Sequence, residues 1–197
     1  MTTQTPSTSP PATDPQAAAV STEPIMRPAS GFIPALSAPT PLIRGSEDGE
    51  QRWFYGGCVH TWKAKAEETG GAFFLFEEHM VRGQATPLHT HPDSDETMYV
   101  LEGEIVMNMG GEDHTIAAGG LFVAPRGVPY AFMVTSESAT LLSLHTPGSC
   151  QAFYMDASEP ITAEQPASEV ADFDRVMASA QKNGGIEVLG PSPFAQP

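Results

Sequence analysis

The sequence is poor in cysteine and has no long apolar run. Cys58 and Cys150 are the only two cysteines among 197 residues, and they form no CxxC motif. Neither a disulfide framework nor a zinc ribbon is therefore expected. Two free thiols favour a reducing compartment, so we predict a cytoplasmic location. No apolar run approaches the roughly 18 residues of a membrane span, and no Sec-type signal peptide is expected.

Positive charge is also scarce. Nine Lys and Arg residues stand against 24 Asp and Glu residues, which gives a net charge of -15 and a pI near 4.5. Such a chain repels phosphate backbones and anionic lipids, so we expect neither nucleic acid nor a membrane as a partner. The length suits one domain of ordinary size with tails.

Composition divides the chain into three parts. Residues 1–44 form an N-terminal arm rich in Pro, Ser, Thr and Ala, which we predict to be disordered up to Pro24 and extended after it. Residues 45–160 contain many short strand patterns separated by Gly, Pro and Ser, including one predicted at Ala152 to Met155. Short strands without intervening helices predict an all-β jelly-roll barrel.

Residues 161–197 start with a different periodicity. One helical face collects the apolar side chains of Val170, Phe173, Val176, Met177 and Ala180. We predict a C-terminal helix capped by Ser168 that ends near Lys182 and Asn183. The tail that follows is expected to return to the barrel.

Two imidazoles and a carboxylate lie close together in the stretch from Gly83 to Gly103. This stretch has the pattern G-x5-HxH-x4-E-x6-G, which contains His89, His91 and Glu96. The spacing places both histidines on one face of a strand and brings Glu96 beside them from the start of the next strand. These are ligand types of a mid-row divalent metal. We therefore predict one divalent transition metal per subunit, with Fe, Mn, Ni, Co and Zn all open.

The pattern resembles the first signature of the cupin superfamily at all of its fixed positions. The second cupin signature, G-x5-P-x-G-x2-H-x3-N, is similar to the segment that starts at Gly119, but Tyr130 stands in place of the histidine and Val134 in place of the asparagine. The resemblance implies a cupin double-stranded β-helix, which is a jelly-roll barrel.

Three roles are open to Tyr130. Its phenolate could bind the metal directly, or its neutral phenol could form a hydrogen bond with bound substrate or with a metal-bound oxygen. The third role is packing alone. His145, on a later strand, is a further candidate for the missing imidazole.

The remaining polar side chains are weaker candidates. His60 and His79 could reach a pocket, whereas His114 follows a Gly-Gly-Glu-Asp turn and is expected to be solvated. No arrangement in the sequence supports thiolate catalysis at Cys58 or Cys150. The side chains available to line an apolar interior are Phe74, Phe76, Met80, Met98, Met107, Phe122, Phe132 and Phe153.

Further segments between residues 53 and 192 look like single-domain cupins similar to quercetin 2,3-dioxygenase. They comprise residues 67–73, 99–104, 122–129, 146–148 and 186–191. In that family three histidines and a glutamate hold a metal, the glutamate accepts the flavonol hydroxyl proton, and dioxygen opens the heterocycle with loss of carbon monoxide. The resemblance carries the ligand role to His89, His91 and Glu96, while Tyr130 departs from it.

The first hypothesis is a metal-dependent, quercetin 2,3-dioxygenase-like oxygenase acting on an aromatic or enolisable small molecule. Glu96 and Tyr130 are its predicted catalytic residues. The second is a non-redox metallo-cupin, a cyclase, isomerase or dehydratase, in which the metal is a Lewis acid and Tyr130 a proton donor. The third is a metal-free barrel that binds a small molecule. A homodimer is the expected assembly.

Overall fold

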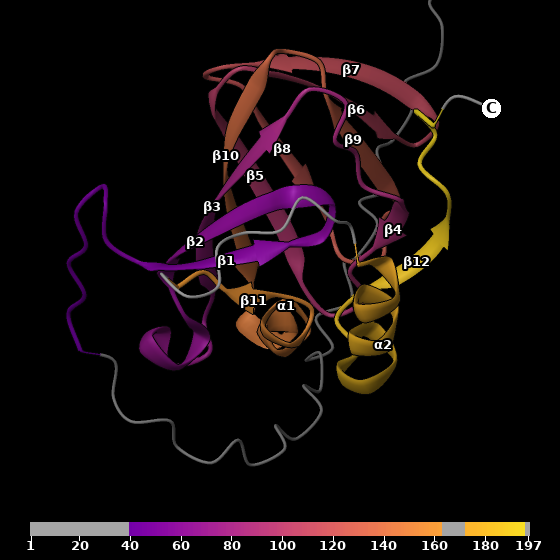
Figure 1. Ribbon diagram of the computed structural model, residues 1–197. Coiled ribbons are helices and arrows are strands. Elements are labelled where there is room, and N and C mark those ends of the chain that lie inside the picture. Colours follow the sequence, from indigo (N-terminus) through magenta and orange to yellow (C-terminus); the bar gives the residue numbers. More distant parts are fainter. Residues whose placement is uncertain (1–39, 163–171, 196–197) are drawn as a thin grey trace, which may run out of the picture. The chain divides into compact units, whose positions relative to one another are not determined.

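A computed structural model describes residues 40–162 and 172–195, and its main elements are two antiparallel β-sheets (Figure 1). In spatial order, the seven-stranded sheet contains β11 (Glu159–Pro160), β1 (Glu50–Phe54), β2 (Cys58–Ala64), β3 (Phe74–Val81), β10 (Ser138–Thr146), β5 (Asp95–Glu102) and β8 (Leu121–Ala124). The five-stranded sheet contains β12 (Glu187–Gly190), β4 (Leu88–Thr90), β9 (Tyr130–Val134), β6 (Glu104–Met109) and β7 (Glu112–Ala117). The predicted all-β jelly roll is confirmed.

Alternating side chains explain why these segments form strands. In β3 every second residue is buried, starting at Phe74, and β10 shows the same alternation with Leu141 inside. A strand with this period turns one face to the core and the other outward. One core cluster joins Val100 and Leu141 of the seven-stranded sheet to Ile105 and Met107 of the five-stranded sheet.

A second core cluster lies under the two helices. It joins Trp62, Phe74 and Phe76 of the seven-stranded sheet to Phe153 of α1 (Gln151–Asp156) and Val176 of α2 (Phe173–Asn183). Short 3-10 helices fill connections at η1 (Tyr55–Gly57), η2 (Ala66–Thr69) and η3 (Gly148–Cys150). Neither described helix is long and apolar enough to cross a membrane.

One local prediction is wrong, and another concerns residues outside the described part of the chain. The strand predicted at Ala152 to Met155 is the helix α1, because so short an apolar run has no period that separates a strand from a helix. The helix α2 begins at Phe173, and Asp172 caps it by accepting a hydrogen bond of 3.0 Å from the backbone N–H of Arg175. The predicted cap, Ser168, lies outside the described residues.

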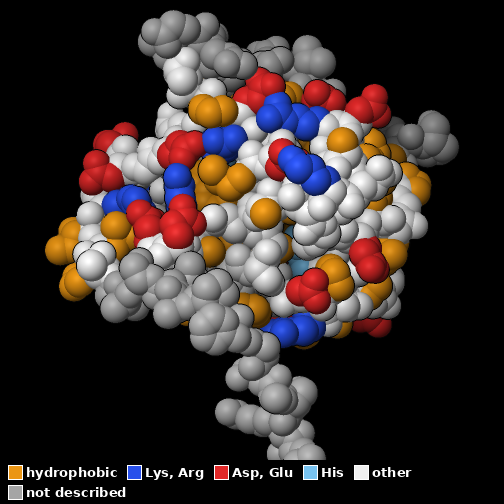
Figure 2. Space-filling model, turned by 90° about the horizontal axis from the view of Figure 1, so that it is seen from below, with side chains coloured by type: hydrophobic (Ala, Val, Ile, Leu, Met, Phe, Trp, Pro, Cys, Tyr) orange, Lys and Arg blue, Asp and Glu red, His pale blue; other side chains and the backbone are white. Residues whose placement is uncertain are grey.

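The chain after α2 returns to the barrel as expected, because β12 pairs with β4 and places Val188 opposite His89. Most of the predicted arm, residues 1–39, lies outside the described residues. Figure 2 shows acidic and basic side chains interspersed with hydrophobic ones on one face, so the acidic excess is not gathered into a single patch there.

Candidate metal centre

Three buried polar side chains meet where β4 leads into β5. His89 lies on β4, His91 directly follows that strand, and Glu96 lies near the start of β5. Their exposed fractions are 5%, 2% and 1%. One donor atom from each side chain lies within 4.8 Å of the other two. The structure therefore brings together the two histidines and the glutamate that the sequence singles out.

The motif glycines permit the backbone turns around this site. Gly83 and Gly103 have φ angles of 83° and 81°, in the left-handed region that disfavours other residues. At Gly103 an added Cβ would also lie 2.2 Å from the carbonyl oxygen of Ser138. This glycine is therefore required both by its backbone conformation and by the close approach of β10.

The distances between donor atoms suit a shared cation. Nε2 of His91 lies 3.4 Å from Oε2 of Glu96. Two donors that each bind one ion at about 2.0 to 2.2 Å lie about 3 to 3.5 Å apart. Both carboxylate oxygens of Glu96 are buried, and neither accepts a hydrogen bond of good geometry from any described residue. A buried carboxylate of this kind needs a cation partner, so the residues fit a metal ion.

Backbone carbonyls orient both imidazole rings. Nδ1 of His89 donates to the carbonyl of Pro87 at 2.8 Å, and Nδ1 of His91 donates to the carbonyl of Gly185 at 2.5 Å. In a neutral ring, a proton on Nδ1 leaves the Nε2 lone pair free, which is the usual arrangement of histidines that bind metals. Burial alone would lower the pKa of His91, but Cys150 and Glu96 outweigh burial and raise it to about 10, so a metal would displace the Nε2 proton of His91. Burial, reinforced by the charge of His91, lowers the pKa of His89 to about 4, so its ring is neutral at pH 7.

His145 contributes a third imidazole. It lies opposite Glu96 in the pairing of β10 with β5, is fully buried, and places Nε2 3.2 Å from Oε1 of Glu96. Its Nδ1 lies 3.4 Å from Sγ of Cys150. Burial alone would lower the pKa of His145, but the negative charges of Glu96 and Cys150 outweigh burial and raise it to about 9. Burial would likewise raise the pKa of Glu96, but His145 and His91 hold it well below its usual range.

Tyr130 lies inside the barrel beside His89. The two residues are paired across β9 and β4, and their ring centroids are 4.4 Å apart. Tyr130 is 1% exposed, and its hydroxyl has no hydrogen-bond partner among the described residues. The hydroxyl is therefore available for a ligand, while its choice between metal and substrate stays a prediction.

Comparison with known proteins places this site in a family. The Cupin domain family matches residues 76–145, a stretch that contains both histidines of the HxH motif, Glu96, Tyr130 and His145. The chain belongs to the cupin superfamily. Cupins commonly bind a transition metal, in keeping with the donor set found here.

Two curated relatives share parts of this cupin. Quercetin 2,3-dioxygenase from Bacillus subtilis (strain 168) is 30% identical over 143 residues, which make up 71% of this chain and 42% of that protein. The HTH-type transcriptional regulator PuuR from Escherichia coli (strain K12) is 35% identical over 66 residues, 33% of this chain and 36% of that protein. The chain thus spans less than half the length of either relative.

Among solved structures, KdgF from Halomonas sp. is similar to this cupin with a TM-score of 0.50 and 18% identity. The similarity covers 55% of this chain and 94% of that one. It supports the fold alone.

Sequence reasoning missed Tyr154, which the helix α1 brings to the centre of this cupin. Its hydroxyl lies 3.4 Å from Nε2 of His91. Burial and the nearby charge of Glu96 raise its pKa well above the usual value, so Tyr154 is a neutral phenol. Only a helical α1 packed under the barrel places it there, and the sequence carried no signal for that contact.

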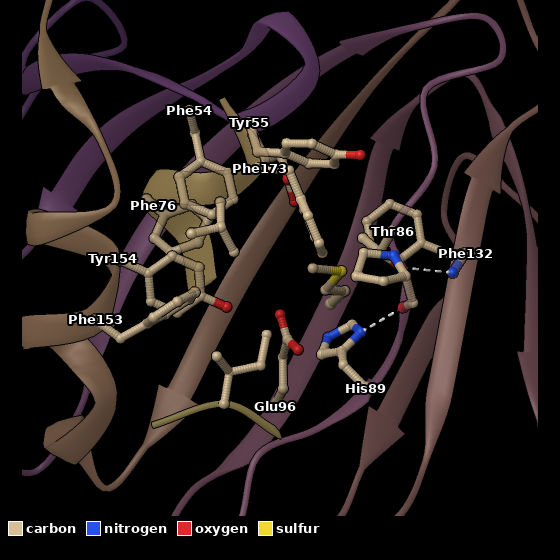
Figure 3. A pocket seen from close by; sticks show the side chains of 15 residues that line it. Phe54, Tyr55, Phe76, Thr86, His89, Glu96, Phe132, Phe153, Tyr154 and Phe173 are labelled. Atoms are coloured by element: carbon tan, nitrogen blue, oxygen red, sulfur yellow. Dashed lines mark hydrogen bonds between the residues drawn. The ribbon is translucent and has the colours of Figure 1, made fainter. Parts of the chain in front are cut away.

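The metal centre opens into an aromatic cavity of about 50 Å³. The carboxylate of Glu96 points into this cavity beside His89, with Phe76, Phe153 and Tyr154 on one side and Phe132 on the other (Figure 3). Met98 is also part of the lining. Of the predicted interior side chains, Phe74, Met80, Met107 and Phe122 are buried in the core but do not line this cavity.

The three remaining histidines differ in burial. His79 and His114 are exposed, the latter as predicted, whereas His60 is fully buried with its ring stacked on Phe54 and Phe76 at centroid distances of 4.6 and 4.2 Å. His60 does not line the cavity.

Both cysteines are free, as expected, and both are buried. The expectation that no arrangement supports a thiolate is wrong for Cys150, which lies beside His145. Cys58 lies 3.2 Å from Oε1 of Glu78, and this carboxylate and burial raise the pKa of its thiol. Burial would raise the pKa of Cys150, but the imidazoles of His145 and His91 lower it to about 6. These neighbours come from distant parts of the chain, so sequence spacing does not reveal them.

Proposed function

We propose that this cupin is a metal-dependent oxygenase that acts on an aromatic or enolisable small molecule. The observation that carries the proposal is the convergence of His89, His91 and Glu96, two of which, His89 and Glu96, line an aromatic cavity. A 2-His-1-carboxylate set leaves coordination positions open for substrate or dioxygen. The similarity to quercetin 2,3-dioxygenase over 71% of the chain supports the same reaction class.

The donor set includes His145 in this proposal. Its Nε2 lies 3.2 Å from Oε1 of Glu96, is buried and has no hydrogen bond of good geometry within the described residues. His145 would then replace, from β10, the histidine that Tyr130 displaces on β9. A bound divalent transition metal would supply Lewis acidity and, if it is redox-active, the means to activate dioxygen.

Side chains of the protein would accept the substrate proton, form a hydrogen bond with the substrate and exclude water. A carboxylate oxygen of Glu96 would accept the hydroxyl proton of the substrate, because it points into the cavity beside His89. The hydroxyl of Tyr130, which lies beside His89 and not on the cavity lining, would donate a hydrogen bond to a substrate oxygen bound near the metal. The aromatic walls shield the reacting group from bulk water.

A substrate of flavonol size requires the cavity to widen. The cavity of about 50 Å³ holds only a few water molecules, whereas sites for such ligands measure about 300 to 1,000 Å³. Tyr55 and Phe173 form one end of the lining, with ring centroids 5.5 Å apart (Figure 3). Phe173 is 37% exposed, so its rotation would open the cavity without disturbing the inner core.

A non-redox cyclase, isomerase or dehydratase is the second candidate, and one observation favours it. Tyr154 is a neutral phenol 3.4 Å from Nε2 of His91, and such a phenol beside a Lewis-acidic metal can donate a proton to an intermediate. This reaction would need no dioxygen.

Elemental analysis and oxygen uptake test the proposal together. Full-length protein purified without a histidine tag is expected to contain a stoichiometric redox-active metal and to consume oxygen with an enolisable aromatic substrate. The variants His89→Ala and Glu96→Gln should lose metal and turnover, whereas His114→Ala, which changes an exposed histidine, should retain both. Turnover in strictly anoxic buffer would instead support the non-redox reaction, and a protein without stoichiometric metal would favour a metal-free binding barrel.

A further inference from the structure

A second buried cluster of metal-ligand side chains lies on β2 and β3. Cys58 and His60 are two residues apart on β2 and both face inward, and His60 lies opposite Glu78 in the strand register. Their exposed fractions are 1%, 0% and 6%. One donor atom from each of the three lies within 4.8 Å of the others.

The carboxylate of Glu78 has the imidazole of His60 as its ion-pair partner among the described residues. Its Oε1 lies 3.2 Å from Sγ of Cys58 and 3.4 Å from Nε2 of His60. Within residues 40–162 and 172–195, neither Lys nor Arg contacts it. Buried carboxylates are normally paired with a cation or coordinate a metal. A thiol and an imidazole thus surround one oxygen of the Glu78 carboxylate. A bound metal ion would supply positive charge to this cluster.

The geometry points to a second metal site, in which Cys58, His60 and Glu78 bind a thiophilic divalent ion such as Zn²⁺ or Co²⁺. Zn–S, Zn–N and Zn–O bonds of about 2.3, 2.0 and 2.0 Å at tetrahedral angles place the donor atoms about 3.3 to 3.5 Å apart. The observed separations of 3.2 and 3.4 Å lie close to this spacing. Three protein ligands leave the fourth position for water.

The ligand types separate this site from the first one. Cys58 offers a soft sulfur donor, whereas His89, His91 and Glu96 offer only nitrogen and oxygen. Burial and the neighbouring Glu78 raise the pKa of the Cys58 thiol, so the free thiol is protonated. Metal binding would form the metal–sulfur bond and release the thiol proton to solvent.

An entry path leads to the cluster. Cys58 and Glu78 line a surface pocket of about 320 Å³ that Gln84 and Met133 also border. Glu78 lines the aromatic cavity of the first site as well, together with His89 and Glu96. An ion on Glu78 would therefore add positive charge at the wall of the proposed substrate cavity.

Cobalt titration of the full-length, tag-free, demetallated protein tests this site. We expect Co²⁺ to bind beyond the first equivalent and to produce a thiolate-to-cobalt charge-transfer band in the near ultraviolet. X-ray absorption of the loaded protein should detect a sulfur ligand at about 2.3 Å. The variant Cys58→Ser should lose the band and one equivalent of cobalt, while His89→Ala should lose the other equivalent and keep the band.

Cys150→Ser is the matched variant, because it removes the other buried thiol. It should retain the band, and Glu78→Gln should weaken it. The proposal is overturned if the wild-type protein shows no sulfur ligand, or if the band disappears in Cys150→Ser but persists in Cys58→Ser. If Cys58→Ser fails to fold, as judged by circular dichroism, the wild-type spectrum and Cys150→Ser still decide the question. None of these readouts depends on oxygenase activity.

Discussion

Tyr130 and Tyr154 place two buried hydroxyl groups beside the histidines of the candidate metal centre. The ring of Tyr130 packs 4.4 Å from that of His89, and the hydroxyl of Tyr154 lies 3.4 Å from Nε2 of His91. The Tyr130 hydroxyl has no partner among the described residues, although a buried polar group without one is costly. Such a cost is tolerated where a ligand completes the hydrogen bonding.

Tyr130→Phe isolates the function of this hydroxyl. The change keeps the ring that packs on His89 and removes only a buried hydroxyl without a partner, so we expect the free energy of unfolding to stay the same or to rise by about 1 kcal/mol. Metal content should stay intact while turnover falls about 100-fold, because the substrate loses a hydrogen bond. Elemental analysis and steady-state kinetics check both expectations.

Tyr99→Phe provides the control, since Tyr99 is 41% exposed on β5 and its change should leave both quantities unaltered. Loss of metal in Tyr130→Phe would show instead that the phenolate is a ligand. Unchanged turnover would leave Tyr130 as a packing residue.

At the scale of elements, Arg44 links the segment before β1 to the 3-10 helix η2. The guanidinium of Arg44 donates to both oxygens of Glu68 at 2.7 and 3.0 Å and to the carbonyl of Lys63 at 2.5 Å. The hydrogen bond from Arg44 lowers the pKa of Glu68. Glu68 also accepts from the backbone N–H of Lys65 and so closes the first turn of η2. One carboxylate thus joins the chain before β1 to the turn after β2.

Arg44→Gln should make stability less dependent on pH. Because the pKa of Glu68 is lower in the folded protein than in the unfolded chain, the pair stabilises the fold above about pH 4.5, and this contribution disappears as the pH falls through the folded-state pKa. The pair is partly exposed, so the expected loss near pH 7 is about 0.5 to 1 kcal/mol. Urea unfolding at a series of pH values measures this loss of stability.

The difference in the free energy of unfolding between wild type and Arg44→Gln should become smaller at acidic pH. Arg82→Gln is the control, because the Arg82 side chain forms no ion pair within the described part of the chain. If Arg44→Gln lost the same amount of unfolding free energy at every pH, the hydrogen bond to Lys63, rather than the charge of Glu68, would be what stabilises the fold.

At the scale of the whole molecule, one sheet edge exposes large apolar side chains. Tyr99 and Leu101 of β5 and Leu121 and Val123 of β8 are between 39% and 55% exposed. Tyr99 is paired with Leu121, and β8 is the last strand of its sheet. Apolar side chains grouped beside a free strand edge are typical of an interface between subunits.

The homodimer remains a prediction, and Leu121→Glu tests whether this face forms it. The wild-type protein should elute as a dimer in size-exclusion chromatography, and the new charge should shift it to a monomer, because an unpaired charge is costly in an apolar interface. Val81→Glu, which changes an exposed residue on β3, should leave the elution unchanged. A monomeric wild-type protein would contradict the prediction, and a chain truncated before Glu50 would show whether the arm contributes.

The local part of the metal centre follows from the sequence alone. His89, His91 and Glu96 lie within eight residues, so strand alternation and a single turn suffice to bring them together. The same alternation indicates the all-β fold, and Gly103 reflects a backbone requirement of its own turn. These features depend on neighbours along the chain.

Tertiary structure alone decided which distant groups complete the site. His145 reaches Glu96 through the register of β10 on β5, Gly185 anchors His91 from the segment after α2, and Tyr154 arrives on a helix where a strand was predicted. The cluster of Cys58 and Glu78 likewise depends on how β2 pairs with β3. Strand register and helix packing are set by burial across the whole core, which no short stretch of sequence encodes.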